Sequence, residues 1–158
     1  MSSPSFVVRA AEEGDRRSLA ELFAAVAEER DGIASEPPVD VEGRAAAWEL
    51  ESTLVAAAGQ DLVGFLHVDA SRFGFGEIGM LVAAEWRGRG VGSALVGAAV
   101  EWGRAHGLHK LSLSVFPHNE AGIALYRKFG FVEEGRRARH MRRSSGELWD
   151  TIEMGLQL

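Results

Sequence analysis

A glycine-rich segment between a strand-like run and a helix-like run constrains the possible folds and functions of this chain more than any other feature. Residues 87–92 are Arg-Gly-Arg-Gly-Val-Gly. They follow the apolar run from Phe75 to Ala83 and precede an amphipathic stretch from about Gly92 to His106. Glycines let the backbone approach a ligand closely, and the first N–H groups of a helix have no intrahelical acceptor. The segment therefore predicts a strand, a tight turn and a helix whose first amides bind an anion such as phosphate.

The same segment excludes two common nucleotide-binding loops. A Walker loop ends in Gly-Lys-Ser/Thr, which is absent, and the dinucleotide fingerprint requires a glycine where this chain has Ser93. Arg87 and Arg89 add positive charge that suits a phosphate group. A tight connection with no ligand remains the structural alternative.

The rest of the chain alternates between strand-like and helix-like patterns. A loop is expected at 31–38, which contains Pro37-Pro38. The predicted elements are strands at 6–10, 53–58, 62–69, 75–83, 110–116, 131–136 and 148–156, and helices from Asp15 to about Arg30, from Asp40 to before Ser52, from about Gly92 to His106 and from Glu120 to Phe129. This order predicts one α/β (α+β) domain over residues 1–158, with a mixed, mostly antiparallel sheet of about seven strands flanked by helices.

Composition narrows the classes of protein. With 46% hydrophobic and 25% charged residues, and no apolar run near the roughly 18 residues of a membrane span, we expect a cytoplasmic protein without a membrane partner. The segment from Met1 to Arg9 lacks the pattern of a secretory signal. The chain has no cysteine, which excludes disulfides and a cysteine nucleophile. No group of His, Asp and Glu has metal-ligand spacing, so no metal is expected.

The net charge of −6 argues against nucleic acid as a partner. Basic residues nevertheless gather near the C-terminus, at Arg136, Arg137, Arg139, His140, Arg142 and Arg143. One interpretation is an edge strand protected by exposed cations. The other is a site for phosphates or carboxylates.

A second motif gives the chain a family resemblance. Residues 119–131 are Asn-Glu-Ala-Gly-Ile-Ala-Leu-Tyr-Arg-Lys-Phe-Gly-Phe. Arg87, Gly90 and Gly92 occupy the places of an Arg/Gln-x-x-Gly-x-Gly/Ala motif, and the two motifs together resemble those of the GNAT acetyltransferases in order and separation. The resemblance extends along nearly the whole chain. It implies the GNAT fold, acetyl-CoA as cosubstrate and transfer of an acetyl group to an amine.

The resemblance also implies where the coenzyme binds. Amides from Arg89 to Ser93 would hold the pyrophosphate, the backbone from Met80 to Val82 would pair with the pantetheine arm, and Asn119 would contact that arm. Asn119 at a helix start is equally well explained as an N-cap. The residues expected to bind the coenzyme are Met80, Leu81, Val82, Arg87, Gly88, Arg89, Gly90, Val91, Gly92, Ser93, Asn119 and Tyr126.

Two residues are the candidates for catalysis. Tyr126, the only tyrosine, would protonate the departing sulfur, since a phenol with a pKa of about 10 is protonated at neutral pH; its alternative is a core aromatic. Glu77 would accept the proton of the amine, and its alternative is a solvent-facing strand residue. A second family position for the base holds Ser114, which argues against a close match to the ribosomal-protein acetyltransferases. His67 and His118 are weaker candidates.

The acceptor is expected to be a small-molecule amine. The C-terminal segment resembles bacterial members that acetylate small amines or amino acids, and the arginine cluster would suit a carboxylate. A protein N-terminus or a lysine side chain is the alternative acceptor, as in the branch that acetylates ribosomal proteins. A module that senses acyl-CoA without catalysis is the alternative of another class. A homodimer is left open.

Overall fold

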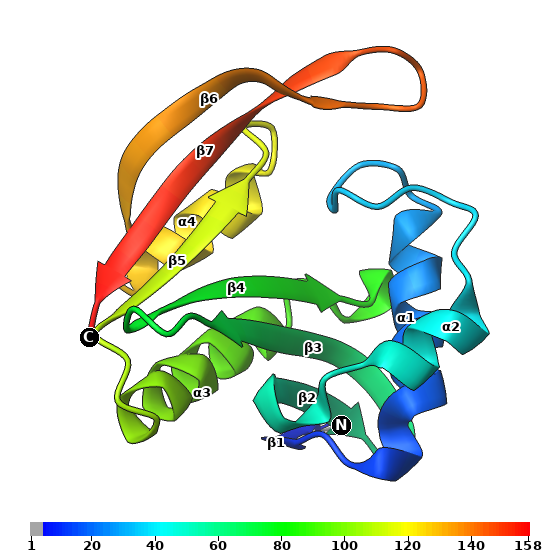
Figure 1. The fold of residues 1–158 in the computed structure, drawn as a ribbon. Helices are drawn as coiled ribbons and strands as arrows, with labels where there is room; N and C mark the ends of the chain where they lie inside the picture. The colour runs from blue at the N-terminus through cyan, green and yellow to red at the C-terminus, as the bar shows by residue number, and fades with distance from the viewer. Residues whose placement is uncertain (1–4) are drawn as a thin grey trace. The chain divides into compact units, whose positions relative to one another are not determined.

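The computed structural model describes residues 5–158, and the predicted fold class is confirmed (Figure 1). Seven strands form one mixed sheet in the order β1-β2-β3-β4-β5-β7-β6, in which β4 and β5 pair in parallel. The elements are β1 (Val7–Ala10), α1 (Arg16–Ala27), α2 (Val41–Ala47), β2 (Thr53–Ala58), β3 (Asp61–Ala70), β4 (Phe75–Val82), α3 (Val91–Ala105), β5 (Lys110–Val115), α4 (Glu120–Lys128), β6 (Val132–Arg142) and β7 (Leu148–Gln157), with short 3-10 turns η1 (Glu13–Asp15), η2 (Leu50–Ser52) and η3 (Ala84–Trp86).

The chain forms two compact units, and β3, β4 and α3 each contribute to both. The N-terminal unit contains the chain up to Val68 together with Gly79–Ala99. The C-terminal unit contains Asp69–Ile78 and Val100–Leu158. In the described residues 5–158, no helix is both long and apolar enough to cross a membrane.

The core of the N-terminal unit lies where α1 covers one face of β2, β3 and β4. The buried side chains that form it are Leu19, Leu22, Val26, Val55, Phe65, Leu81 and Ala83. On the opposite face, an added Cβ at Gly64 would lie 3.1 Å from Val91 Cγ1 and 3.3 Å from Leu95 Cδ1. The start of α3 therefore packs directly on the backbone of β3.

The second predicted helix is shorter than expected. We expected a helix that carries Trp48 and ends just before Ser52, but α2 ends at Ala47 and Trp48 has extended backbone angles. Two side-chain contacts replace the missing turn. Arg16 donates to the carbonyls of Ala45 and Trp48, at 3.0 and 2.9 Å, and the Trp48 indole donates to Thr53 Oγ1. The hydrogen bonds from Arg16 satisfy two carbonyls that a longer helix would have paired internally.

The C-terminal unit is built on β5, whose residues alternate between its two faces. Leu111, Leu113 and Val115 are buried, whereas Ser112 is half-buried and Ser114 is exposed. The second half of α3 lies against the buried face, because an added Cβ at Gly103 would lie 3.5 Å from Leu111 Cδ2.

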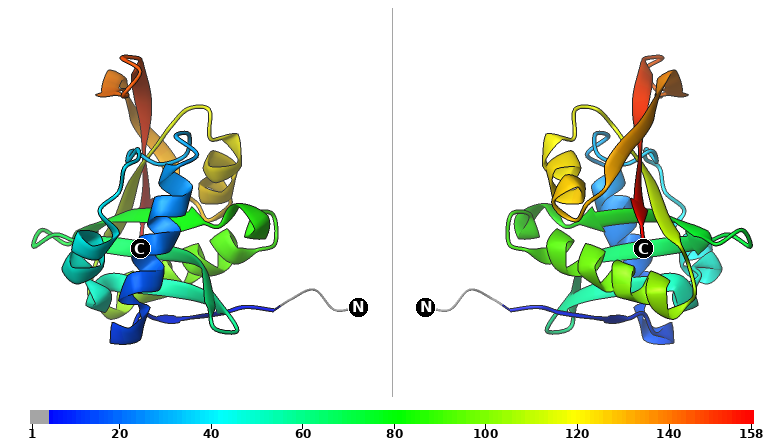
Figure 2. Two further views of the ribbon diagram at one scale, coloured as in Figure 1. Left: turned by 90° about the vertical axis from the view of Figure 1, so that its right-hand side faces the viewer. Right: turned by 90° about the vertical axis from the view of Figure 1, so that its left-hand side faces the viewer.

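The β6–β7 hairpin differs in length from the prediction. We expected the first strand to span 131–136, but β6 runs from Val132 to Arg142 and pairs with β7 along that length (Figure 2). The register shifts between Arg137 and Met141, where Arg139 has a φ of +50°. Asp150 stabilises this bulge by accepting from the Arg139 backbone at 2.7 Å and from Arg136 Nε at 2.8 Å. These hydrogen bonds also lower the pKa of Asp150.

The arginine cluster divides into two parts. Since β6 ends the strand order and its side chains are almost all exposed, the edge-strand interpretation is confirmed for that strand. Arg143, just beyond β6, is instead only 4% exposed. Its guanidinium lies 4.3 Å from the Trp149 ring centroid and 5.5 Å from that of Phe116, which places one cation among aromatic rings.

Candidate functional site

The glycine turn joins β4 to α3 in the N-terminal unit. Gly88 and Gly90 have φ values of +76° and +86°, a region that side chains with a Cβ seldom occupy. An added Cβ at either glycine would meet nothing within 4 Å. These two glycines are thus required by the path of the backbone, and the space above them is open.

The helix begins directly after the second of these glycines. The amide of Ala94 donates to the Gly90 carbonyl at 3.1 Å, which is the first hydrogen bond of α3. The N–H groups of Val91, Gly92 and Ser93 precede that bond, so the helix geometry leaves them no intrahelical acceptor. They carry the positive end of the helix dipole and form an arrangement that binds anions.

Arg87 holds the turn in place. Its two terminal nitrogens donate to the Glu29 carboxylate at 2.7 and 2.9 Å, and its Nε donates to the Val82 carbonyl at 3.0 Å. The hydrogen bond with Glu29 raises the pKa of Arg87. The Arg87 guanidinium is therefore engaged by protein groups, and its expected contact with phosphate stays a prediction.

Arg89 has a different environment. It is exposed, and its guanidinium lies 4.9 Å from the ring centroid of Trp86. Within residues 5–158, the guanidinium of Arg89 contacts a ring face, whereas that of Arg87 is paired with a carboxylate.

The strand that leads into the turn is well anchored. Leu81 is buried in the core, whereas Met80 and Val82 are half-buried. The Ala83 amide donates to the Val63 carbonyl at 2.8 Å, which fixes the end of this strand to β3.

Asn119 begins α4 in the C-terminal unit. Its Oδ1 accepts a hydrogen bond from the Gly122 amide at 3.0 Å, so the N-cap interpretation is confirmed. An added Cβ at Gly122 would lie 2.6 Å from Asn119 Nδ2, which explains why a glycine follows at this spacing. A contact between Asn119 and the coenzyme stays a prediction.

Tyr126 lies on the buried side of α4. It is 8% exposed, and its ring centroid is 5.6 Å from that of Phe131. Burial raises the pKa of Tyr126 to about 12, because the phenolate would lose its hydration. The phenol is therefore neutral across the physiological range and suited to donate a hydrogen bond.

Glu77 lies on the polar face of the C-terminal unit. Its carboxylate is exposed, and its register partner on the parallel strand β5 is Ser112. Ser112 and Ser114 alternate with the buried residues of β5 and so share one face. The sequence left open which face of the strand carries Glu77, and the structure places its side chain on the solvent-facing side.

Glu153 is a residue of this face that sequence reasoning missed. It accepts hydrogen bonds from Ser114 and from Thr151 Oγ1, the latter at 2.9 Å, and Arg137 Nε lies 3.4 Å from its carboxylate. The register that pairs Ser114 with Glu153 brings them together across β5 and β7. The sequence offered one indication, because Ser114 stands where the family resemblance implies a base. Only the register of β5 and β7 identifies Glu153 as its partner.

The two histidines that were considered have local partners. His67 Nδ1 lies 3.2 Å from the hydroxyl of Thr53 in the N-terminal unit. His118 is exposed in the C-terminal unit, with its ring stacked at 5.6 Å on Phe116 and edge-on at 4.9 Å to Trp149.

The predicted site residues fall into two groups, one in each unit. The N-terminal unit holds the coenzyme set from Met80 to Ser93, and the C-terminal unit holds Glu77, Asn119 and Tyr126. Among residues 5–158, no three His, Asp or Glu side chains come together as a metal site would require.

Comparisons with known proteins agree on one family. The model of the acetyltransferase (GNAT) family matches residues 17–131. An L-amino acid N-acetyltransferase of Escherichia coli is 34% identical over 109 residues, which are 64% of this chain and 65% of that protein, so the chain spans just under two thirds of this relative's length. An L-methionine sulfoximine/L-methionine sulfone acetyltransferase of Pseudomonas aeruginosa is 34% identical over 115 residues, 66% of this chain and 67% of that protein.

A solved structure extends the likeness to almost the whole chain. The ribosomal-protein-alanine N-acetyltransferase of Brucella melitensis superposes with a TM-score of 0.88 at 28% identity, over 96% of this chain and 99% of that one. The two chains therefore share one fold along almost their whole length.

Proposed function

Because the chain belongs to the acetyltransferase (GNAT) family, we propose that it transfers an acetyl group from acetyl-CoA to a primary amine. The observation that carries the proposal is the open glycine turn at the start of α3. Its amides from Val91 to Ser93 and the exposed Arg89 suit a pyrophosphate, and a Cβ added at Gly88 or Gly90 would meet no described residue within 4 Å apart from the glycine's chain neighbours. The backbone from Met80 to Val82 would then hold the pantetheine arm.

The transfer proceeds by direct attack within a ternary complex. The lone pair of the amine nitrogen attacks the thioester carbonyl carbon, a C–N bond forms, and the C–S bond breaks to release the thiolate of coenzyme A. The nitrogen loses one proton, which Glu77 accepts. No cysteine is present to carry the acetyl group on the protein.

Tyr126 stabilises the leaving sulfur. With its pKa raised to about 12, the phenol is a much weaker acid than a thiol near 8.5, so full proton transfer to the thiolate costs about 5 kcal/mol. A hydrogen bond from the phenol to the developing thiolate requires no such transfer. Tyr126 therefore acts as a neutral donor whose contribution grows as the C–S bond breaks.

The proposed acceptor is a small amine or an amino acid. The names of the Escherichia coli and Pseudomonas aeruginosa relatives support an amino acid. An α-amino group with a pKa of about 7.7 costs only about 1 kcal/mol to deprotonate at pH 7, whereas a lysine side chain near 10.4 costs about 4.6 kcal/mol. An α-amino acceptor therefore needs less help from a base.

A second acceptor class has one observation in its favour. The likeness to the Brucella melitensis protein over almost the whole chain supports a protein N-terminus, which is also an α-amine. Ser114 argues against it, because it replaces the carboxylate expected at that base position in the ribosomal-protein branch. Free amino acids and short peptides with an N-terminal alanine separate the two classes.

The experiment has a binding arm and a turnover arm. Acetyl-CoA should raise the melting temperature, while ATP and NAD should not, because a ligand of the native state stabilises it by mass action. Thiol release with a panel of amines then identifies the acceptor, and the protein adds no background because it lacks cysteine. Stabilisation by NAD alone would contradict the proposal. Binding of acetyl-CoA with no turnover on any amine would instead favour an acyl-CoA sensor.

A further inference from the structure

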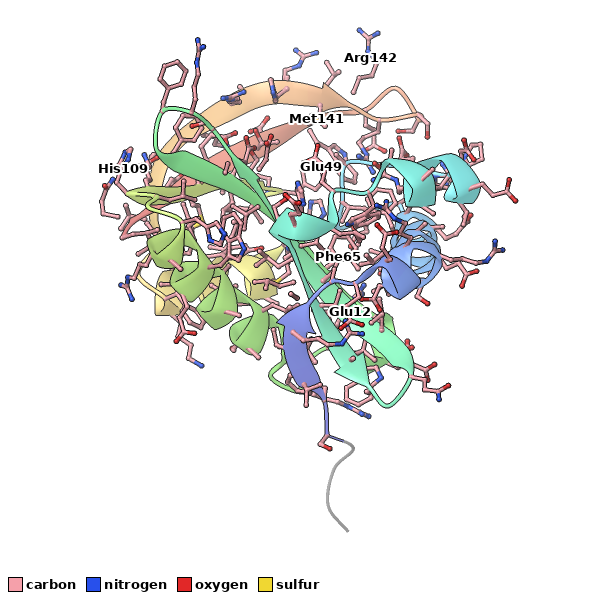
Figure 3. All side chains as sticks on the ribbon, turned by 60° about the horizontal axis from the view of Figure 1, so that its bottom comes forward. Glu12, Glu49, Phe65, His109, Met141 and Arg142 are labelled. Carbon is pink, nitrogen blue, oxygen red and sulfur yellow. The ribbon has the colours of Figure 1, made fainter. Side chains whose placement is uncertain are left out.

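His67 belongs to a hydrogen-bond network centred on a buried hydroxyl. Thr53 is 1% exposed, and its register partner across β2 and β3 is His67. Thr53 Oγ1 lies 3.1 Å from the indole nitrogen of Trp48, 2.8 Å from the Glu49 carbonyl and 3.2 Å from His67 Nδ1. Figure 3 labels Glu49, at the start of this network, and Phe65, against whose ring Trp48 packs at 4.9 Å.

The hydrogens of this network can be assigned by counting. A threonine hydroxyl has one hydrogen and can accept two hydrogen bonds. The Glu49 carbonyl has no hydrogen, so the contact of 2.8 Å uses the hydrogen of Thr53. The Trp48 indole only donates. The remaining contact must therefore use a hydrogen on His67 Nδ1.

This assignment fixes the tautomer of the imidazole. A neutral ring with its proton on Nδ1 has an unprotonated Nε2, which can only accept a hydrogen bond. The network thus contacts Nδ1 of the ring and, by holding the proton there, leaves Nε2 as a hydrogen-bond acceptor.

The position of His67 places this nitrogen beside the proposed pantetheine strand. The Val63 carbonyl accepts from the Ala83 amide, and the Phe75 carbonyl accepts from the Ser71 amide. One antiparallel register joins both pairs and sets His67 opposite Gly79. Gly79 directly precedes Met80, and an added Cβ there would meet nothing within 4 Å. His67 is only half-buried, so part of this residue is accessible on the face that the register gives it in common with Gly79.

We infer that His67 is a further catalytic residue, whose Nε2 accepts a hydrogen bond from the acceptor amine and orients its nitrogen above Gly79. This inference rests on the proposed acetyl transfer. Thr53 is a positioning residue, because it acts through the tautomer of His67. Neither His67 nor Thr53 lies in the two motifs, at 87–92 and 119–131, that carry the family resemblance.

The central variant is His67→Asn. The asparagine amide can replace Nδ1 as donor to Thr53, but it has no counterpart of Nε2. We expect kcat/KM for the amine to fall by roughly ten- to a hundredfold, with the melting temperature and the affinity for acetyl-CoA nearly unchanged. His106→Asn is the matched control, since His106 Nδ1 bonds the Trp102 carbonyl at 2.8 Å at the end of α3. It should keep full activity.

A second pair of variants tests the network itself. Thr53→Val removes the hydroxyl, frees the tautomer of His67 and should lower kcat/KM for the amine several-fold. Thr53→Ser restores the hydroxyl and should restore activity. A purely structural role of Thr53 would change the melting temperature in Thr53→Val without changing kcat/KM in the fraction that remains folded.

Nitrogen-15 NMR of the histidine rings gives a readout independent of activity. The His67 signals, assigned by their loss in His67→Asn, should show a protonated Nδ1 and a bare Nε2. A protonated Nε2 at neutral pH, or wild-type kinetics in His67→Asn, would overturn the inference about His67 but would leave the proposed acetyl transfer standing. Absence of turnover by the wild-type protein on every amine would instead overturn the proposed function, and the tautomer could still be measured.

Discussion

Ser114 on β5 donates its hydroxyl hydrogen to the carboxylate of Glu153, its register partner on β7. The same carboxylate accepts from Thr151 and lies 3.4 Å from Arg137 Nε. Ser114 has no second hydrogen to donate, and a hydroxyl is not a base at neutral pH. The position at which the family resemblance implies a base is therefore part of a local polar network in this protein.

The first prediction is that Ser114→Ala keeps kcat/KM for amines within about threefold of wild type, a change of ~0.6 kcal/mol. The reason is that the Glu153 carboxylate keeps its contacts with Thr151 and Arg137. Steady-state kinetics over the amine panel measures it. A loss of more than about a hundredfold would assign general-base work to this position on β5.

The second prediction compares two glycines whose backbone φ angles are both positive. Gly90 in the turn and Gly146 between β6 and β7 have φ values of +86° and +93°, and an added Cβ is unobstructed at both. Gly90→Ala and Gly146→Ala should each lose about 1–2 kcal/mol of stability, measured by urea unfolding. Calorimetric titration should show at least a roughly tenfold loss of acetyl-CoA affinity in Gly90→Ala alone. Equal affinities would reduce the turn to a structural connection.

The third prediction concerns turnover in Tyr126→Phe. Removing the phenol hydroxyl should lower kcat by roughly ten- to a thousandfold, because the developing thiolate loses its donor. The affinity for acetyl-CoA, measured by calorimetry, should stay nearly constant, since the ring remains in the core. Unchanged kcat would leave Tyr126 with a packing role only.

The fourth prediction is a loss of stability at alkaline pH that comes from Tyr126. Its pKa is raised from about 10 in the unfolded chain to about 12 in the folded one, so between these values the unfolded state binds fewer protons. The contribution is fully present below pH 10 and is lost as the pH rises through 12, by roughly 3 kcal/mol. The difference in unfolding free energy between wild type and Tyr126→Phe isolates it from other groups.

Tyr126 is the only tyrosine, so the ultraviolet absorbance of tyrosinate reports its titration without interference from another phenol. A midpoint near 10 in the folded protein would show that the hydroxyl is hydrated and would contradict the buried environment.

The fifth prediction is graded by the acceptor. Glu77→Gln should lower the rate and move the rising limb of the pH–rate profile upward, because the amine must lose its proton unaided. The loss should be larger for acceptors with a pKa near 10 than for those near 8, since the cost of deprotonation differs by about 3 kcal/mol. An equal loss for both classes, with the pH profile unchanged, would mean that Glu77 positions the substrate and does not act as the base.

Most of the fold follows from local patterns in the sequence. The alternation of β5 and the glycines after β4 predict their elements to within a residue or two, because each depends on neighbours in the chain. The end of α2 was predicted wrongly because Arg16, 29 and 32 positions away in the chain, donates to the carbonyls of Ala45 and Trp48. The length of β6 was missed because Asp150 stabilises a bulge in a segment of arginines.

The candidate site shows the same division. The residues proposed to bind the coenzyme are 80–82, 87–93, Asn119 and Tyr126, and most of them lie in two short stretches that the sequence alone could identify. The partners of Ser114 and His67 come from neighbouring strands, and a shift of the register by one residue would change them. Residues that become partners only through the pairing of neighbouring strands could therefore be identified only from the structure.

The clamp between Arg87 and Glu29 joins the glycine turn to a residue just beyond α1, 58 positions earlier in the chain. Glu29 lies in a segment without any phosphate-binding motif, yet its variants should disturb the glycine turn as Arg87 variants do, for a reason that the local sequence does not show. Their effects should be epistatic with those at Arg87, because either change breaks the same pair. The double variant of Glu29 and Arg87 should therefore lose little more than either single variant, although the two residues lie on separate segments of the chain.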